Sequence, residues 1–93
     1  MVSGKIVIKD GLGIHLRPAS LIAEEALKYA CKVELCYNDR RVNGKSLLSI
    51  LSLGIRKGNE LEVCCDGADE EAALTAVMDV ISHADDLAAR SST

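Results

Sequence analysis

Hydrophobic and polar positions alternate with a period of two in three short stretches, residues 5–9, 32–37 and 60–66, which predicts β-strands. A fourth and shorter strand over residues 40–42 follows Asn38-Asp39, a pair that favours the tight turn of a hairpin. On each of the three alternating strands the aliphatic side chains share one face, namely Ile6 and Ile8, then Val33, Leu35 and Tyr37, then Leu61, Val63 and Cys65.

Two longer segments repeat their apolar positions every three or four residues, which predicts amphipathic helices. The first covers residues 16–29, and its stripe consists of Ala19, Ile22, Ala26 and Ala30. The last helix opens at Asp69 with Glu70 and Glu71 in its first turn, where the helix dipole favours acidic side chains. Its stripe consists of Leu74, Val77, Ile81 and Ala84.

A short helix is predicted over residues 47–52, between the strands predicted at residues 40–42 and 60–66. Ser46 is expected to be its N-cap, and Gly54 is expected to end it in the left-handed conformation. The complete order is strand, helix, strand, strand, helix, strand, helix. This order predicts one α+β domain over residues 1–93, with a mostly antiparallel four-stranded sheet, three helices on one face and the other face open to water.

Composition and charge add three expectations, one about the core and two about partners and location. Hydrophobic residues make up 48% of the chain and the aromatic residues are two tyrosines, so the core is expected to be aliphatic. The net charge of −3 gives no electrostatic reason to expect a nucleic-acid partner. No apolar run reaches the roughly 20 residues that cross a bilayer, and the N-terminus has no signal-peptide pattern, so a cytoplasmic protein without membrane insertion is expected.

The cysteines are expected to act as small hydrophobic residues with free thiols rather than as metal ligands, because none forms a CxxC pair and both histidines are distant in sequence. Cys36 and Cys64 are expected to point to the open face of the sheet and to be exposed, with Cys65 buried on the other face. No role is assigned to the four cysteines, which are Cys31, Cys36, Cys64 and Cys65.

The candidate chemistry lies in the stretch GIHLRPAS, at the start of the first helix. Pro18 is tolerated in a first helical turn, which places His15 at or just before the N-cap. A helix N-terminus binds anions and disfavours a positive imidazole, so His15 is expected to be mainly neutral and nucleophilic. Arg17 would supply hydrogen bonds to a phosphoryl group. From these residues alone two interpretations stand: a phosphohistidine site, or an exposed histidine beside a solvated arginine.

The motifs GIHLRPA at residues 13–19, KSLL at residues 45–48 and LGI at residues 53–55 resemble those of the HPr family, the histidine-containing phosphocarriers of the bacterial phosphotransferase system. The resemblance extends from about residue 4 to residue 84. It implies an open-faced β-sandwich with four antiparallel strands and three helices, in the order βαββαβα. Leu16 and Ser20 depart from the residues that the family more often has at these positions.

The resemblance implies a carrier rather than an enzyme, which takes a phosphoryl group on His15 from phosphorylated enzyme I and gives it to the A domains of sugar permeases. Arg17 matches the residue that steadies the phosphoryl group, and Pro18 matches the proline that opens the first helix. Ser46 matches a serine that a dedicated kinase phosphorylates in many Gram-positive bacteria. Neither a cofactor nor a metal is implied, and a carrier that meets successive partners is expected to be a monomer.

The short helix carries four aliphatic residues within five positions, and they cannot all face inward. By resemblance, the outward members and part of the first helix form a shared docking site for partners, consisting of Ser20, Glu24, Leu47, Leu48 and Leu51. Two alternatives remain open at this point. One is a paralogue with a mainly regulatory role through Ser46, and the other is a protein-interaction domain that carries no phosphate.

Overall fold

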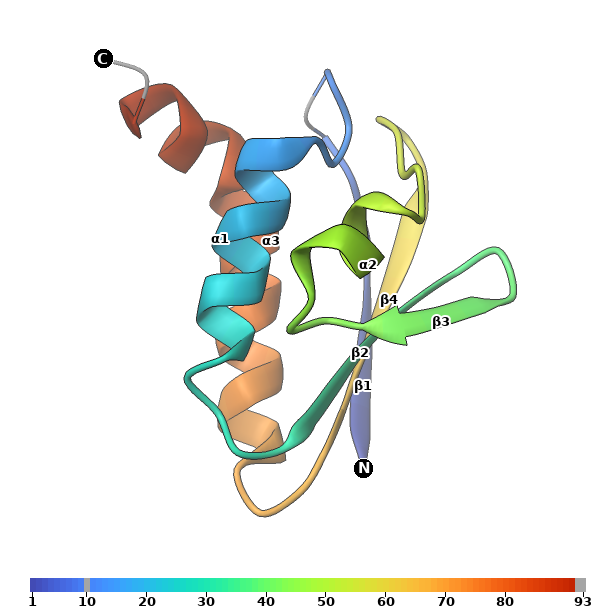
Figure 1. Ribbon diagram of the computed structural model, residues 1–93, viewed down its shortest axis with the longest axis vertical. Coiled ribbons are helices and arrows are strands. Elements are labelled where there is room, and N and C mark those ends of the chain that lie inside the picture. Colours follow the sequence, from blue (N-terminus) through green and yellow to red (C-terminus); the bar gives the residue numbers. More distant parts are fainter. Residues whose placement is uncertain (10, 92–93) are drawn as a thin grey trace.

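Four strands form one antiparallel sheet in the computed structural model of the chain (Figure 1), which describes residues 1–9 and 11–91, with side chains described as far as residue 83. The strands are β1 (Val2–Val7), β2 (Lys32–Tyr37), β3 (Arg40–Asn43) and β4 (Glu60–Asp66). Their order across the sheet is β1-β4-β2-β3. The last strand in sequence therefore lies between the first two, so β4 and β2 are the central strands.

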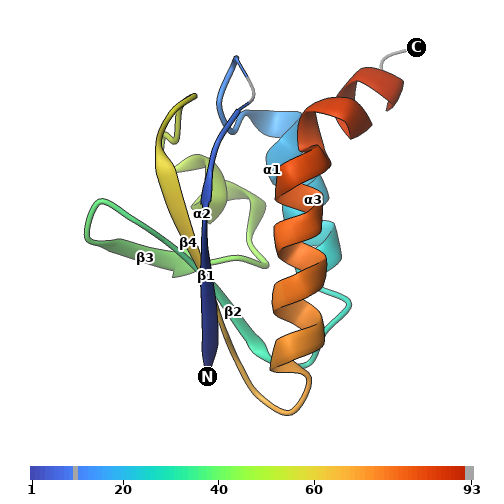
Figure 2. The same ribbon diagram turned by 180° about the vertical axis from the view of Figure 1, so that it is seen from behind.

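Three helices cover one face of this sheet: α1 (Leu16–Ala26), α2 (Leu47–Leu51) and α3 (Glu70–Ser91). Helices α1 and α3 pack side by side, and α3 contacts β1 and β4 (Figures 1 and 2). The shorter α2 packs against α1 and β3. The element order βαββαβα and the predicted α+β architecture are confirmed. No helix in the described part of the chain combines the length and apolar character that a membrane span requires.

The core lies between the sheet and the helices and is aliphatic, as the composition predicts. The helix-facing side chains of β2 and β4 are almost inaccessible to solvent, with Leu35, Leu61, Val63 and Cys65 at 0% exposure. From α1, Ala19, Ile22, Ala23 and Ala26 pack into the same layer, and from α3, Ala73, Val77 and Ile81. The predicted stripes are confirmed at Ala19, Ile22, Ala26, Val77 and Ile81, whereas Leu74 is only partly buried against the core. Ala84 lies outside the residues whose side chains are described.

The first strand begins and ends at different residues from those predicted. It covers Val2–Val7 rather than residues 5–9, because it pairs with β4 from Val2 opposite Cys65 to Val7 opposite Glu60. Ile8 is nevertheless buried, as predicted, at 5% exposure. Its backbone continues the pairing by donating to the Asn59 carbonyl at 3.0 Å and accepting from Gly58 at 2.8 Å.

The first helix ends earlier than its periodicity predicts, at Ala26 rather than Tyr29, and Ala30 is exposed rather than part of the buried stripe. A distant residue accounts for the change of direction. The Asp69 carboxylate, at the start of α3, accepts hydrogen bonds from the backbone N–H of Ala30 at 2.8 Å and of Cys31 at 2.9 Å. These bonds hold the pKa of Asp69 below its usual value. They draw the chain away from α1 and into β2.

The remaining local predictions are confirmed. Asn38 and Asp39 both have positive φ, at 53° and 66°, and so form the hairpin turn between β2 and β3. Gly54 has φ of +63° just after α2, in the left-handed conformation expected at a helix end. Asp69 precedes α3, and Glu70 and Glu71 occupy its first turn.

Candidate functional site

The loop before α1 is held against the chain that follows α2. The Ile14 N–H donates to the Ile55 carbonyl at 2.9 Å, and the Ile14 side chain is buried. Gly13 has φ of +70°, and a Cβ atom there would lie only 2.4 Å from the Ile55 carbonyl oxygen and 2.7 Å from Cα of Arg56. Only glycine permits this approach. The motifs at residues 13–19 and 53–55 therefore meet in space, and their contact fixes where His15 lies.

His15 is the N-cap residue of α1, as predicted. Its backbone is extended (φ −103°, ψ −167°), and its carbonyl accepts the first helical hydrogen bond from Ala19 at 3.0 Å. The imidazole makes no capping hydrogen bond to the helix and is half-buried. A histidine in this position can present a ring nitrogen to a partner without breaking a helix cap.

The first turn of α1 consists of Leu16, Arg17 and Pro18. Leu16 and Arg17 carry the first two backbone N–H groups of the helix, which have no helical acceptor one turn earlier, whereas Pro18 has no N–H. Leu16 is 62% exposed, Arg17 is exposed and Pro18 is fully buried. The helix end thus combines a buried anchor with an exposed guanidinium two residues from His15. This arrangement suits a dianionic group bound at the imidazole.

Ser46 caps α2, as predicted, with its Oγ accepting the Ser49 N–H at 3.3 Å. The approach to this cap is ordered by Asn43, whose side chain accepts the Lys45 N–H at 2.9 Å and whose carbonyl accepts the Ser46 N–H at 3.2 Å. The Lys45 ammonium donates to the Tyr29 carbonyl at 2.7 Å, just after α1. Ser46 is half-buried, so its hydroxyl lies near the surface.

The expected docking residues lie on α1 and α2, which pack against each other (Figure 1). As the helix geometry requires, the aliphatic residues of α2 differ in exposure to solvent: Ile50 is 1% exposed and Leu48 is 77% exposed. Leu47 and Leu51 are half-buried, as is Ser20 on α1, and Glu24 is exposed. These five predicted residues, Ser20, Glu24, Leu47, Leu48 and Leu51, are called the docking surface below.

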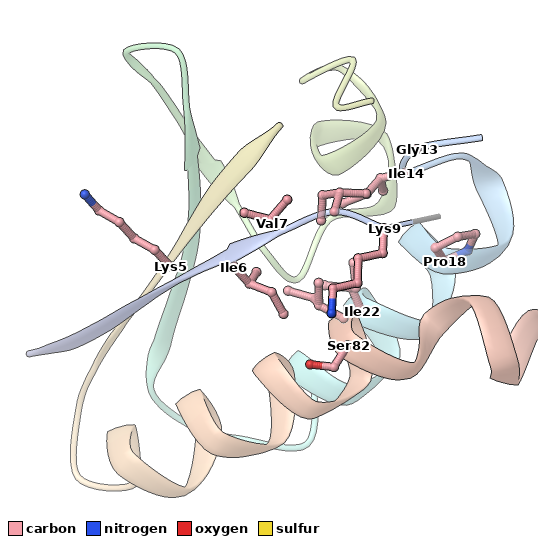
Figure 3. A pocket seen from close by; sticks show the side chains of 11 residues that line it. Lys5, Ile6, Val7, Lys9, Gly13, Ile14, Pro18, Ile22 and Ser82 are labelled. Carbon is pink, nitrogen blue, oxygen red and sulfur yellow. The ribbon is translucent and has the colours of Figure 1, made fainter. Parts of the chain in front are cut away.

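An apolar pocket of about 340 Å³ opens beside this region, between β1, α1 and α3 (Figure 3). Its lining includes Ile8, Ile14, Pro18, Ile22 and Ile81 but neither His15 nor Arg17. The lining also includes Lys5, Lys9 and Ser82, but it has no charged group from the first turn of α1.

The cysteines follow the alternation of the strands, with one correction. Cys31 and Cys65 belong to the core, at 3% and 0% exposure. Cys36 and Cys64 point to the open face as predicted, but the prediction that both are exposed is wrong, because Cys64 is 5% exposed and Cys36 is half-buried. Both lie on the central strands, where the longer side chains of neighbouring residues surround a short thiol.

Sequence reasoning missed the roles of Gly13 and Asp69. The glycine was visible beside the histidine, but only the fold shows that Ile55 and Arg56 lie against it. The sequence pattern predicts Asp69 only as a helix start, although its carboxylate also holds the chain between α1 and β2. Both roles depend on contacts between segments about 40 residues apart in sequence, for which local pattern carries no signal.

Comparison with known proteins gives a consistent result. The family model described as "PTS HPr component phosphorylation site" matches residues 2–83. The chain is 46% identical over 72 residues to the phosphocarrier protein HPr of Mycoplasma genitalium, an alignment that covers 76% of this chain and 82% of the relative.

Solved structures with this fold include HPr-C-His from Thermoanaerobacter tengcongensis, with a TM-score of 0.86 and 35% identity, covering 91% of this chain and 96% of that one. A histidine-containing phosphocarrier protein from Mycoplasma has a TM-score of 0.85 and 31% identity, covering 89% and 96% of the two chains. Sequence and structure thus point to the same group of relatives.

Proposed function

Because the chain belongs to the HPr family, the phosphocarriers of the phosphotransferase system, we propose that it accepts a phosphoryl group on His15 from phosphorylated enzyme I and passes it to the A domains of sugar permeases. The observation that carries the proposal is the position of His15 as the N-cap of α1, at the positive end of the helix dipole and two residues before Arg17. This placement agrees with a carrier that works in the cytoplasm with successive partners.

The proposed transfer uses the neutral imidazole as nucleophile. The Nδ1 lone pair attacks the phosphorus atom, a bond between Nδ1 and phosphorus forms, and the bond between phosphorus and its donor atom on enzyme I breaks. The proton of the neutral ring stays on Nε2. The backbone N–H groups at the start of α1 and the guanidinium of Arg17 would then stabilise the added negative charge.

The docking surface extends this proposal to the partners. Leu48, exposed at 77%, would be buried against enzyme I, a permease domain or a kinase, and Glu24 would contribute at the polar rim. We also propose that a phosphate on Ser46 regulates this docking. The carrier is proposed to act as a monomer, so that the same surface serves each partner in turn.

The test is phosphoryl transfer from phosphoenolpyruvate through enzyme I to the purified chain. We expect a phosphate bond that is labile in acid and stable in base, as for a phosphohistidine. His15→Ala should abolish labelling without loss of the fold, and His83→Ala is the matched control because it removes the chain's other histidine, an exposed residue on α3.

Labelling that survives His15→Ala would overturn the assignment of the phosphorylated residue. Absence of labelling in the wild-type chain, with an active enzyme I and a competent reference carrier, would instead favour the regulatory paralogue or the interaction domain. Incubation of the same preparation with a Ser46 kinase would then separate these two alternatives.

A further inference from the structure

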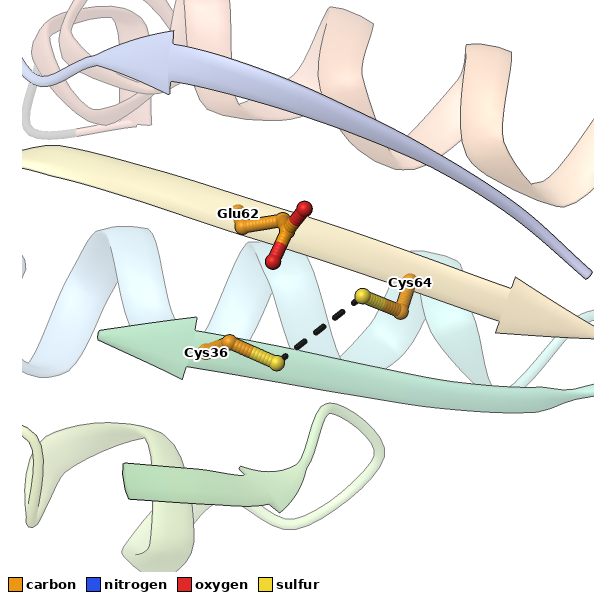
Figure 4. Close-up of side chains that lie close together, drawn as sticks. All are labelled: Cys36, Glu62 and Cys64. Atoms are coloured by element: carbon orange, nitrogen blue, oxygen red, sulfur yellow. Dashed lines mark hydrogen bonds between the residues drawn. The ribbon is translucent and has the colours of Figure 1, made fainter. Parts of the chain in front are cut away.

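Two thiols and a carboxylate converge on the open face of the sheet, away from the helices and from His15 (Figure 4). Cys36 on β2 lies directly opposite Glu62 on β4, and Cys64 is the next residue of β4 on the same face. The two sulfur atoms are 3.8 Å apart. The ligand atoms of all three residues lie within 4.8 Å of one another.

The sulfur separation matches metal coordination better than a disulfide. Two thiolates bound at about 2.3 Å to a tetrahedral ion lie about 3.8 Å apart. A disulfide requires about 2.05 Å between the sulfurs and a Cα separation below about 7 Å. Cys36 and Cys64 are diagonal neighbours rather than directly opposed residues. Diagonal pairs have Cα atoms about 7–8 Å apart, at or beyond the limit for a disulfide.

The surroundings supply compensating charge from the other two strands. Arg41 on β3 lies opposite Cys36, interacts electrostatically with both thiols and donates to Glu34 at 3.0 Å. On β1, Lys5 lies opposite Glu62. Two thiolates and a carboxylate carry three negative charges, so a divalent cation leaves one; because Arg41 is already paired with Glu34, Lys5 can balance this remaining charge.

We propose that Cys36, Cys64 and Glu62 form a binding site for a single Zn²⁺ ion, with water as the fourth ligand. Two thiolates with a carboxylate form a donor set that suits Zn²⁺ and disfavours Mg²⁺, which takes oxygen ligands in octahedral geometry. Binding forms two zinc–sulfur bonds and one zinc–oxygen bond to the protein; these bonds replace bonds to waters of the hydrated ion, which keeps one water. Each thiol loses its proton to the solvent.

The test is titration of the reduced, untagged full chain with Co²⁺, followed by displacement with Zn²⁺. We expect one equivalent of Co²⁺ to give a sulfur-to-cobalt charge-transfer band and the intense visible bands of tetrahedral cobalt. Zn²⁺ should remove these bands and Mg²⁺ should not. Cys36→Ser and Cys64→Ser should each weaken binding by about 100-fold or more, because each removes one of the two thiolate ligands.

Glu62→Gln removes a ligand from a half-buried surface position, so its weaker binding would not reflect loss of the fold. Three variants serve as matched controls that should leave binding unchanged: Cys31→Ala and Cys65→Ala on the core face, and Glu71→Gln on α3. His15→Ala should also retain the cobalt spectrum, so this result is independent of phosphoryl transfer. Absence of a thiolate band in the wild-type chain, or unchanged cobalt affinity in Cys36→Ser, would overturn the site.

Discussion

Helices α1 and α2 begin in different ways. At α2, the side chain of Ser46 accepts a backbone N–H of its own helix. At α1, the N-cap residue is His15, whose side chain makes no such bond, and Pro18 removes one N–H from the first turn. The start of α2 is therefore satisfied by its own cap, whereas the start of α1 leaves its N–H groups to other partners. The helix start at which we propose phosphoryl transfer therefore lacks the local stabilisation of a side-chain cap.

The largest effect is expected when the cap of α2 is transferred to α1. His15→Ser should abolish phosphoryl acceptance, because the nucleophilic ring is gone. Since residue 15 already has the extended backbone of an N-cap, the free energy of unfolding should stay equal or rise by about 0.5 kcal/mol. Enzyme I labelling and urea denaturation measure the two quantities. A clear loss of stability would contradict the view that the imidazole contributes nothing as a cap.

The next prediction concerns how α1 is held in place. Gly13→Ala should lower the free energy of unfolding by at least about 2 kcal/mol, because the methyl group meets the Ile55 carbonyl in a left-handed backbone conformation. Phosphoryl transfer should slow as well, since the loop that places His15 must shift. Gly11→Ala is the control, because a Cβ atom there meets nothing within 4 Å. Equal stability of the two variants would contradict the prediction that a methyl group at residue 13 destabilises the fold.

A smaller effect is expected from the guanidinium beside His15. Arg17→Ala should slow phosphoryl transfer by about 10- to 100-fold, the loss expected for a charged hydrogen bond. Stability should change little, because Arg17 is exposed. Rapid-quench labelling measures the rate, and Arg56→Ala is the control for loss of an exposed positive charge. Wild-type rates in Arg17→Ala would show that the arginine does not contact the phosphoryl group.

The smallest effect is expected at the start of α2. Ser46→Asp keeps a capping oxygen and adds a negative charge, so thermal stability should stay equal or rise slightly. Phosphorylation of His15 by enzyme I should slow by about fivefold, the equivalent of about 1 kcal/mol of like-charge repulsion at the docking surface. Ser46→Asn is the neutral control with the same capping geometry. A much lower melting temperature, or an unchanged rate, would contradict the electrostatic effect.

Local signals predicted most of the fold. The turn at Asn38-Asp39, the Ser46 cap and the Gly54 helix end each depend on residues within about four positions of one another, and all three occur as predicted. Contacts between residues distant in the sequence determine the element bounds that local patterns could not predict. The path of the chain after α1 depends on a carboxylate 39 residues from Ala30, and the bounds of β1 depend on its pairing with β4.

The candidate site divides in the same way. The order of residues around His15 was sufficient to predict the N-cap position, but the support of Gly13 by Ile55 and Arg56 required the fold. For the thiols, alternation gave the correct face. It could not show that Cys36 and Cys64, separated by 28 residues, bring their sulfur atoms to 3.8 Å.

The hydrogen bond from Ile14 to Ile55 makes one amide a reporter on the loop beside the candidate phosphorylation site. This N–H is held at 2.9 Å in a buried position, so it exchanges with deuterium only when the loop separates from the residues that follow α2. The neighbouring amide of the exposed Leu16 lies at a helix start and should exchange far faster. The intrinsic exchange rate of the Ile14 amide divided by its observed rate gives the opening free energy of this loop without a mutation.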